Sequence, residues 1–228
     1  MFSDVPLRSR EIKGFVRKLG ADLVAILYVD GIDDENTKTE LKNYLEGARS
    51  IIIFGRRLEH VMMKEKDEES AGYQITIRKT VKLIARKLVR FIFGSGFSSK
   101  ILSNPEEMWK SKINIKNLAE LAGLGQIGFN NLLLTPKFGP RVLIAAIVTD
   151  ALLEPDAKNE LTICLELKGT SCKKCADACP QLAISFTGRF YETKCLKQLN
   201  EDIELYQSYC CTLCITSCPI GHPDSSER

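Results

Sequence analysis

The chain has 228 residues, of which 44% are hydrophobic and 27% charged, and its 32 basic and 29 acidic side chains give a net charge of +3. This composition is typical of a globular protein, and the length predicts one main domain with a small appendage. The near balance of charges gives no reason to expect binding to nucleic acid or to a membrane. No apolar run approaches the roughly eighteen residues of a membrane span, and the N-terminus has no apolar signal core, so we expect a cytoplasmic protein.

The first part of the chain alternates between helical and strand patterns. Residues 9–20 carry hydrophobic side chains at helical spacing, and residues 21–29 predict a buried strand. The sequence then predicts a second helix, which ends at Leu45, and a second strand at residues 51–54. After a charged stretch that we expect to be solvated, residues 73–92 carry a long amphipathic stripe that predicts a core helix.

Residues 94–109 break this pattern, and the segment from 114 to 150 restores it. There we expect a helix, a glycine turn, a short strand, a Pro-Gly turn and a longer strand. Residues 142–148 are almost continuously apolar, which is typical of a central strand covered on both faces. The alternation predicts an α+β or mixed α/β layer fold.

All nine cysteines lie between Cys164 and Cys218. In a reducing compartment such a cluster indicates metal binding rather than disulfide bonds. Residues 172–180 and 211–219 both read Cys-x2-Cys-x3-Cys-Pro. In two-cluster ferredoxins the cysteine before the proline binds the other cluster, so such runs occur in pairs. The two runs therefore predict two [4Fe–4S] clusters, with structural zinc or a single cluster as the alternatives.

Each run lacks the first cysteine of the bacterial ferredoxin pattern, because Gly169 and Ser208 stand at those positions. Cys164 and Cys195 lie upstream of the two runs and are the natural replacements. With the crossover, the predicted ligand sets are Cys164, Cys172, Cys175 and Cys218 for one cluster, and Cys179, Cys195, Cys211 and Cys214 for the other. Cys210 is left over; it could replace Cys211, although only Cys211 keeps the two-residue spacing to Cys214.

Residues 121–156 resemble the segment before the cluster module in epoxyqueuosine reductases and in corrinoid-dependent reductive dehalogenases. Residues 18–26 and 46–55 resemble the N-terminal part of the same superfamily. The resemblance implies an α+β fold with a nitroreductase-like core domain in residues 1–158 and a two-cluster, bacterial-ferredoxin-like module in residues 159–228. It also implies a base-off corrinoid in the core domain, with its cobalt near one cluster; a corrinoid is favoured over a flavin.

The turn Gly-Leu-Gly-Gln-Ile-Gly at 123–128 fits such a role, because Gly123, Gly125 and Gly128 allow close approach of a bulky ligand. The same glycines equally permit a tight turn between helix and strand. The turn is not a dinucleotide fingerprint, since a helix and not a strand precedes it. Polar residues that follow could contact the amide side chains or phosphate of a corrinoid, although each also fits a turn or capping role: Asn130, Asn131, Thr135 and Arg141.

The catalytic residues are left unassigned. The stretch that carries the proposed proton-donating Asp in epoxyqueuosine reductases has no counterpart in residues 110–120. Tyr73 and Tyr191 are candidate proton donors, but a structural role is favoured for both. His60 and His222 are too isolated to form a dyad or a separate metal site.

Two functions remain open. The first is an oxidoreductase that passes electrons from the clusters to a corrinoid, or with less support to a flavin. The second is a ferredoxin-like electron-transfer or accessory protein that docks a partner redox enzyme and has no chemistry of its own. Both need a protein that donates or accepts electrons, and neither needs nucleic acid or a membrane; the oligomeric state is left open.

Overall fold

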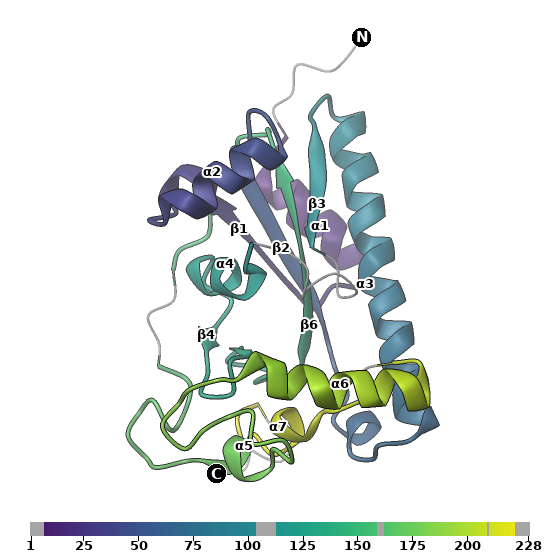
Figure 1. Ribbon diagram of the computed structural model, residues 1–228. Coiled ribbons are helices and arrows are strands. Elements are labelled where there is room, and N and C mark those ends of the chain that lie inside the picture. Colours follow the sequence, from purple (N-terminus) through teal and green to yellow (C-terminus); the bar gives the residue numbers. More distant parts are fainter. Residues whose placement is uncertain (1–6, 104–112, 159–161, 209, 222–228) are drawn as a thin grey trace. The chain divides into compact units, whose positions relative to one another are not determined.

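The structure is a computed structural model that describes residues 7–103, 113–158, 162–208 and 210–221 (Figure 1). The chain forms two compact units. The first unit comprises Met1–Arg56, Arg78–Leu124 and Leu143–Glu160, and the second comprises Arg57–Ile77, Gly125–Val142 and Leu161–Arg228. This division differs from the single boundary expected after residue 158, because two earlier segments join the cysteine-rich region.

The first unit is built on a four-stranded sheet with the order β1 (Leu23–Tyr28), β2 (Ser50–Arg57), β6 (Val142–Thr149) and β3 (Ser99–Ser103). β1 pairs antiparallel with β2, and β3 pairs antiparallel with β6. β6 lies between two neighbours and its last six residues are buried, in agreement with its apolar sequence. β3 falls in a segment where the sequence predicted no element. The fold is therefore mixed α/β.

Four helices of the first unit lie where the sequence predicted helices: α1 (Ser9–Lys18), α2 (Glu35–Tyr44), α3 (Glu68–Gly94) and α4 (Ile115–Leu121). The short η1 (Val29–Gly31), which follows β1, was not predicted. α2 begins where the Asp34 carboxylate accepts the Thr37 amide at 2.9 Å. The rings of Phe15 on α1 and Phe91 on α3 stack with centroids 4.3 Å apart. The boundary between the two units falls within α3, after Ile77. In the described part of the chain, no helix is long and apolar enough to cross a membrane.

The second unit has little regular structure. It contains η2 (Val61–Met63), the hairpin β4 (Gln126–Ile127) and β5 (Leu133–Leu134), and the helices α5 (Lys174–Asp177), α6 (Glu192–Tyr206) and α7 (Leu213–Thr216). α5 and α7 occupy equivalent places in the two cysteine runs: each begins two residues after the first cysteine and contains the second. They also pack against each other. The repeated sequence thus gives a repeated local structure.

Candidate metal centres

The eight cysteines expected to bind clusters line two separate hollows of the second unit. The first group consists of Cys164, Cys172, Cys175 and Cys218, around a hollow of about 320 Å³. The second group consists of Cys179, Cys195, Cys211 and Cys214, around a hollow of about 440 Å³. Both volumes include space open to solvent. The cysteine before each proline lies with the other run, which is the arrangement that the crossover rule describes.

All nine cysteines are free thiols. In the described parts of the chain, no three His, Cys, Asp or Glu side chains are arranged to hold a metal ion as they stand. The thiols therefore surround their hollows without converging on one point.

The wall of the first hollow comes from the β4–β5 hairpin. Oε1 of Gln126 accepts the backbone amides of Ile163 at 2.7 Å and of Cys164 at 3.1 Å. Leu134 packs with Cys164 and Cys218 in one apolar cluster. The hairpin thus fixes Cys164, one of the two ligand candidates that lie outside the repeated runs.

Three glycines in and next to the hairpin allow close contact with Leu134 and Ile220. A Cβ atom on Gly125 would meet the carbonyl of Leu134, and one on Gly128 would lie 2.5 Å from a methyl carbon of Leu134. Gly139 has a φ of +55° and its missing side chain would meet the carbonyl of Ile220. Packing within the hairpin is therefore enough to require glycine here, and a role of Gly125 and Gly128 in ligand approach stays a prediction.

The other residues expected to contact a cofactor also lie in the second unit, and three of them bond to its backbone. Asn130 is buried, and its Nδ2 donates to the carbonyl of Cys214 at 3.2 Å. The Thr135 hydroxyl closes the turn to Gly139 at 3.2 Å. Arg141 is 3% exposed and donates from Nη2 to the Ile220 carbonyl at 2.7 Å. Asn131 stands in the turn with a φ of +58°. Of these residues, Asn130 bonds directly to a cysteine run and Arg141 to the residue that follows one.

The wall of the second hollow comes mainly from α6. Cys195, Gln198 and Leu199 of this helix line the hollow together with residues of both cysteine runs. Cys211 lines it as well, whereas the adjacent Cys210 is 1% exposed and its thiol donates to the Ser208 carbonyl at 3.6 Å. The hydroxyl of Thr212 donates to the carbonyl of Met63 at 2.8 Å, which ties the second run to η2.

Burial holds several of these thiols in the neutral form. It raises the pKa of Cys175 to about 11, with repulsion from Cys218 and Cys164 adding to the effect. Burial also raises the pKa of Cys214, and repulsion from Cys211 and Cys195 adds to it. Thiolates are the form that binds metal, so binding of a metal by these cysteines would release protons from them.

Cys218 and Cys211 have a nearby cation that opposes the effect of burial. Burial raises the pKa of both thiols. The Arg141 guanidinium lowers the pKa of Cys218, and the Lys66 ammonium lowers that of Cys211. Both cations therefore favour the thiolate form that a cluster needs.

The candidate proton donors lie elsewhere in the second unit. The hydroxyl of Tyr73 accepts the Glu59 amide at 2.7 Å. The ring of Tyr191 lies 5.2 Å from the Arg189 guanidinium and 4.8 Å from the Lys194 ammonium. Neither tyrosine lines the two hollows. His60 immediately precedes η2, and His222 lies outside the described residues.

Sequence reasoning missed several residues that support the cysteine groups. They are Gln126, which bonds to Cys164, and Gln198, Asp202 and Lys66, which form a network at Cys211. A signal for two of them existed. Cys195, Gln198 and Asp202 are spaced three and four residues apart, which places them on one face of a helix. Lys66 had no such signal, because it stands in a charged segment that we expected to be solvated.

No protein-family model matches this chain. The chain is 50% identical over 68 residues to a tetrachloroethene reductive dehalogenase of Desulfitobacterium hafniense, covering 30% of this chain and 12% of that one. It is 29% identical over 209 residues to an epoxyqueuosine reductase of Bacillus cereus, covering 82% of this chain and 52% of that one. The chain thus spans about half or less of the length of these curated relatives.

Solved structures show the same fold. An epoxyqueuosine reductase in complex with a tRNA stem loop superposes with a TM-score of 0.67 at 20% identity, over 94% of this chain and 65% of that one. A reductive dehalogenase studied for its mechanism of B12-dependent dehalogenation gives 0.72 at 23% identity, over 100% and 34%. The resemblance expected from the sequence is confirmed: the chain is a distant relative of the epoxyqueuosine reductases and the reductive dehalogenases.

Proposed function

We propose that the chain is an iron–sulfur redox protein that holds two [4Fe–4S] clusters, one in each cysteine group. The observation that carries this proposal is the sorting of eight thiols into two fours, with the cysteine before each proline in the opposite group. Each cluster of this type needs four thiolates, and two-cluster ferredoxins exchange that same cysteine. The donor set therefore fits two clusters better than structural zinc or a single cluster.

The residues of the chain would hold and shield the clusters, which supply one-electron storage and transfer. Cys164 is held by Gln126, and Cys195 stands on α6. Apolar side chains, among them Phe129 and Leu134 at the first hollow and Leu199 at the second, restrict the access of water. Low exposure of this kind also tunes the reduction potential of a cluster.

The proposed activity is that of a reductase in which the clusters deliver electrons to a corrinoid, or to a flavin as the less favoured cofactor. The support is the similarity to epoxyqueuosine reductases and to reductive dehalogenases. By this analogy the first unit is a nitroreductase-like core and the second is a ferredoxin-like module. The protein is expected to act in the cytoplasm with a separate electron donor.

A second function is favoured by one observation. Asn130, Thr135 and Arg141, three of the four polar residues expected at a corrinoid, donate hydrogen bonds to backbone carbonyls of the second unit. This geometry suits a ferredoxin-like electron-transfer or accessory protein that docks a partner redox enzyme. Both functions require the clusters.

The clusters and their grouping are tested together by anaerobic reconstitution of the full chain, followed by iron and sulfide analysis and EPR of the reduced protein. We expect about eight irons per chain. Cys172→Ser/Cys218→Ser removes two ligands of the same group and should leave about four irons. Its matched control, Cys172→Ser/Cys179→Ser, removes one ligand from each group and should leave almost none. Equal iron in the two double variants would overturn the grouping, and a wild-type protein without reducible clusters would overturn the function.

The cofactor is tested by adding cob(II)alamin to the reconstituted protein and recording its EPR spectrum. A base-off cobalt signal that couples magnetically to a reduced cluster is expected for the reductase. An unchanged signal of free cobalamin beside intact reduced clusters would exclude the corrinoid and favour electron transfer to a partner, with flavin binding tested next by its visible absorption.

A further inference from the structure

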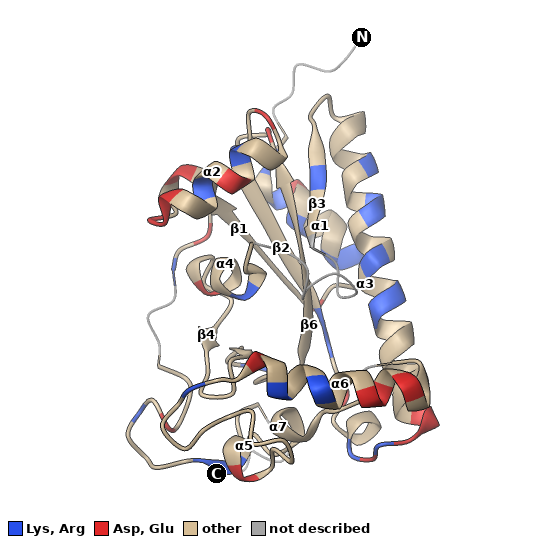
Figure 2. Ribbon diagram, viewed as in Figure 1, with Lys and Arg blue, Asp and Glu red and all other residues tan. Residues whose placement is uncertain are grey.

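A buried carboxylate stands behind the second cysteine group. Three acidic residues gather in the last two turns of α6 (Figure 2). Glu201 and Glu204 are exposed, whereas Asp202 is 0% exposed. A negative charge close to the C-terminus of a helix opposes the helix dipole, and a buried carboxylate needs bonding partners to offset its lost hydration. The buried charge of Asp202 therefore destabilises the fold unless its bonding partners offset the lost hydration.

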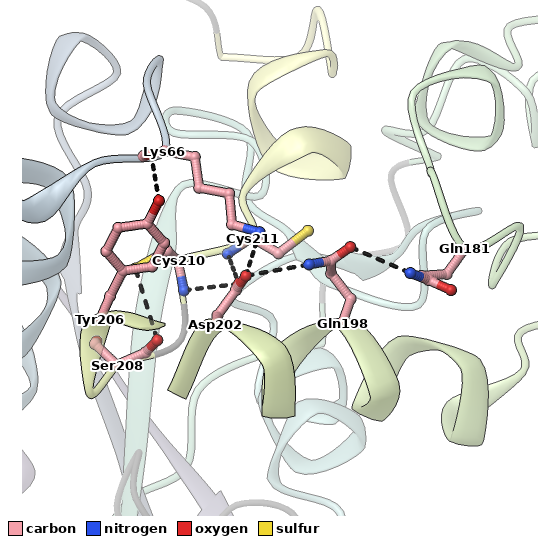
Figure 3. A network of polar contacts seen from close by, with 8 residues as sticks. All are labelled: Lys66, Gln181, Gln198, Asp202, Tyr206, Ser208, Cys210 and Cys211. Carbon is pink, nitrogen blue, oxygen red and sulfur yellow. Dashed lines mark hydrogen bonds and ion pairs between the residues drawn. The ribbon is translucent and has the colours of Figure 1, made fainter. Parts of the chain in front are cut away.

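Asp202 has four such partners (Figure 3). Its Oδ2 accepts the backbone amides of Cys210 at 3.1 Å and of Cys211 at 2.6 Å. Its Oδ1 accepts Nε2 of Gln198 at 3.1 Å and forms an ion pair with the ammonium of Lys66. One carboxylate thus joins the second cysteine run, α6 and the segment that contains Lys66.

The two backbone bonds fix how the adjacent cysteines point. Because one oxygen holds both amides, the backbone at Cys210 and Cys211 cannot turn freely. The sulfur of Cys211 points away from the carboxylate and lines the second hollow (Figure 3). The thiol of Cys210 instead donates to the Ser208 carbonyl. The network therefore presents one of two neighbouring cysteines to the hollow.

The network also brings two opposite charges close to that cysteine. The carboxylate of Asp202 contacts the backbone of Cys211 through the 2.6 Å bond to its amide, and the ammonium of Lys66 pairs with that same carboxylate. Hydrogen bonding to Asp202 raises the pKa of Lys66, so this ammonium stays charged at neutral pH. The hydroxyl of Tyr206 holds the backbone of Lys66 by donating to its carbonyl at 3.1 Å.

We propose that Asp202 and Lys66 are positioning residues of the second cluster. Asp202 holds Cys211, in preference to Cys210, as the ligand, and the two opposite charges set the reduction potential of this cluster without changing that of the first. The inference rests on the proposed function, because it requires a cluster in the second group.

The test is a redox titration of the full chain carrying both clusters, followed by EPR, for Asp202→Asn, Lys66→Met and the double variant. Loss of the carboxylate should make the second cluster easier to reduce, and loss of the ammonium should make it harder. Each change should be about tenfold in the one-electron equilibrium, or about 59 mV, with the double variant near wild type. Shifts in the same direction for both single variants would indicate structural damage and overturn the proposal.

Two exposed neighbours serve as matched controls. Glu201→Gln on α6 and Lys64→Met near Lys66 change the same charges at the surface. Neither should move either potential. The Lys66 side chain is also 42% exposed, but the buried Asp202 holds it in an ion pair beside the cysteine loop, whereas charges that are free to move at the surface are screened by water and salt. Shifts equal to those of Asp202→Asn and Lys66→Met would mean that general surface charge is responsible and would overturn the specific role.

The choice of ligand is tested by iron content. Cys211→Ser alone should leave about four irons, because Cys210 is held away from the hollow. In Cys211→Ser/Asp202→Asn the loop is released, and partial recovery of the second cluster through Cys210 is expected. Full iron retention in Cys211→Ser alone would overturn the selection. If Asp202→Asn does not fold, Lys66→Met decides: an unchanged second potential overturns the electrostatic role. Intact clusters without these shifts would leave the proposed function standing.

Discussion

The two cysteine groups share one motif but differ in the buried charge beside them. Each contains four thiols and a short helix of the same length at the same place in its run. Beside the first group lies a cation, Arg141, which is 3% exposed; beside the second lies an anion, Asp202, which is 0% exposed and paired with Lys66. The repeated motif therefore supplies six of the eight candidate ligands, whereas the unrepeated surroundings set the electrostatic environment.

The two hollows also differ in the structural elements that line them. Residues of the β4–β5 hairpin contribute to the lining of the first hollow, and residues of the amphipathic helix α6 contribute to that of the second. Neither wall has a counterpart at the other group. A change in one wall should therefore affect one cluster alone, and the following variants test this independence.

The largest effect is expected from the two ligands outside the repeated runs. Cys164→Ser should remove the first cluster and Cys195→Ser the second, each lowering the iron content from about eight to about four. The reduced EPR spectra of the two variants should be complementary, since each retains the cluster that the other lacks. Cys210→Ser is the control and should keep both clusters. Loss of iron in Cys210→Ser equal to that in Cys195→Ser would contradict the assignment.

A smaller effect is expected from the packing of the first wall. Gly139→Ala places a methyl group against the Ile220 carbonyl at a φ of +55°. It should lower the free energy of unfolding by about 2–5 kcal/mol, as the sum of left-handed strain and overpacking. Gly169→Ala is the matched control: its φ is +85° but its Cβ would meet nothing within 4 Å, so only about 1–2 kcal/mol of strain is expected.

Urea unfolding followed by circular dichroism measures both variants. In the reconstituted protein, Gly139→Ala should also weaken retention of the first cluster before the second. Equal destabilisation by the two substitutions would show that the close approach at Ile220 is unimportant.

The smallest effect is expected from Arg141. In Arg141→Met the apolar part of the side chain remains but the charge is lost, so the added electron of the first cluster loses a favourable interaction. The potential of the first cluster should fall by up to about 59 mV, a tenfold change in the one-electron equilibrium, with the second unchanged. Lys137→Met, which removes an exposed charge from the same turn, is the control. A shift of both clusters in Arg141→Met would show that the groups are not electrostatically separate.

Elements with a strong periodic pattern could be predicted from the sequence. The apolar runs of β1 and β6 and the stripe of α3 were found because burial leaves a direct trace in hydrophobic spacing. β3 was missed because it is short and begins with Ser99 and Lys100, without an apolar run. The spacing of the cysteines was likewise informative, since a ligand loop has a fixed length.

The supports of the site could not be predicted in the same way. The bond from Gln126 to Cys164 joins residues 38 positions apart, and the ion pair of Lys66 with Asp202 joins two distant charged segments. Such pairs depend on tertiary packing. A single polar residue on a helix or turn does not indicate, from the sequence alone, which distant residue it will bond to. Contact of Asn130 and Arg141 with a cofactor stays a prediction, and the sequence could not show that backbone carbonyls would accept hydrogen bonds from their side chains.

The interleaving of the two units along the chain limits how the protein can be divided. The polypeptide changes unit after residues 56, 77, 124, 142 and 160. Cutting the chain near residue 158 would leave the cysteines without Gln126, Arg141 and Lys66, which come from upstream segments. We therefore do not expect the cysteine-rich region to keep its structure when it is separated from the upstream segments. Synthesis of the upstream segments precedes that of Cys218, so the residues that support both cysteine groups are already translated when this last cysteine is added.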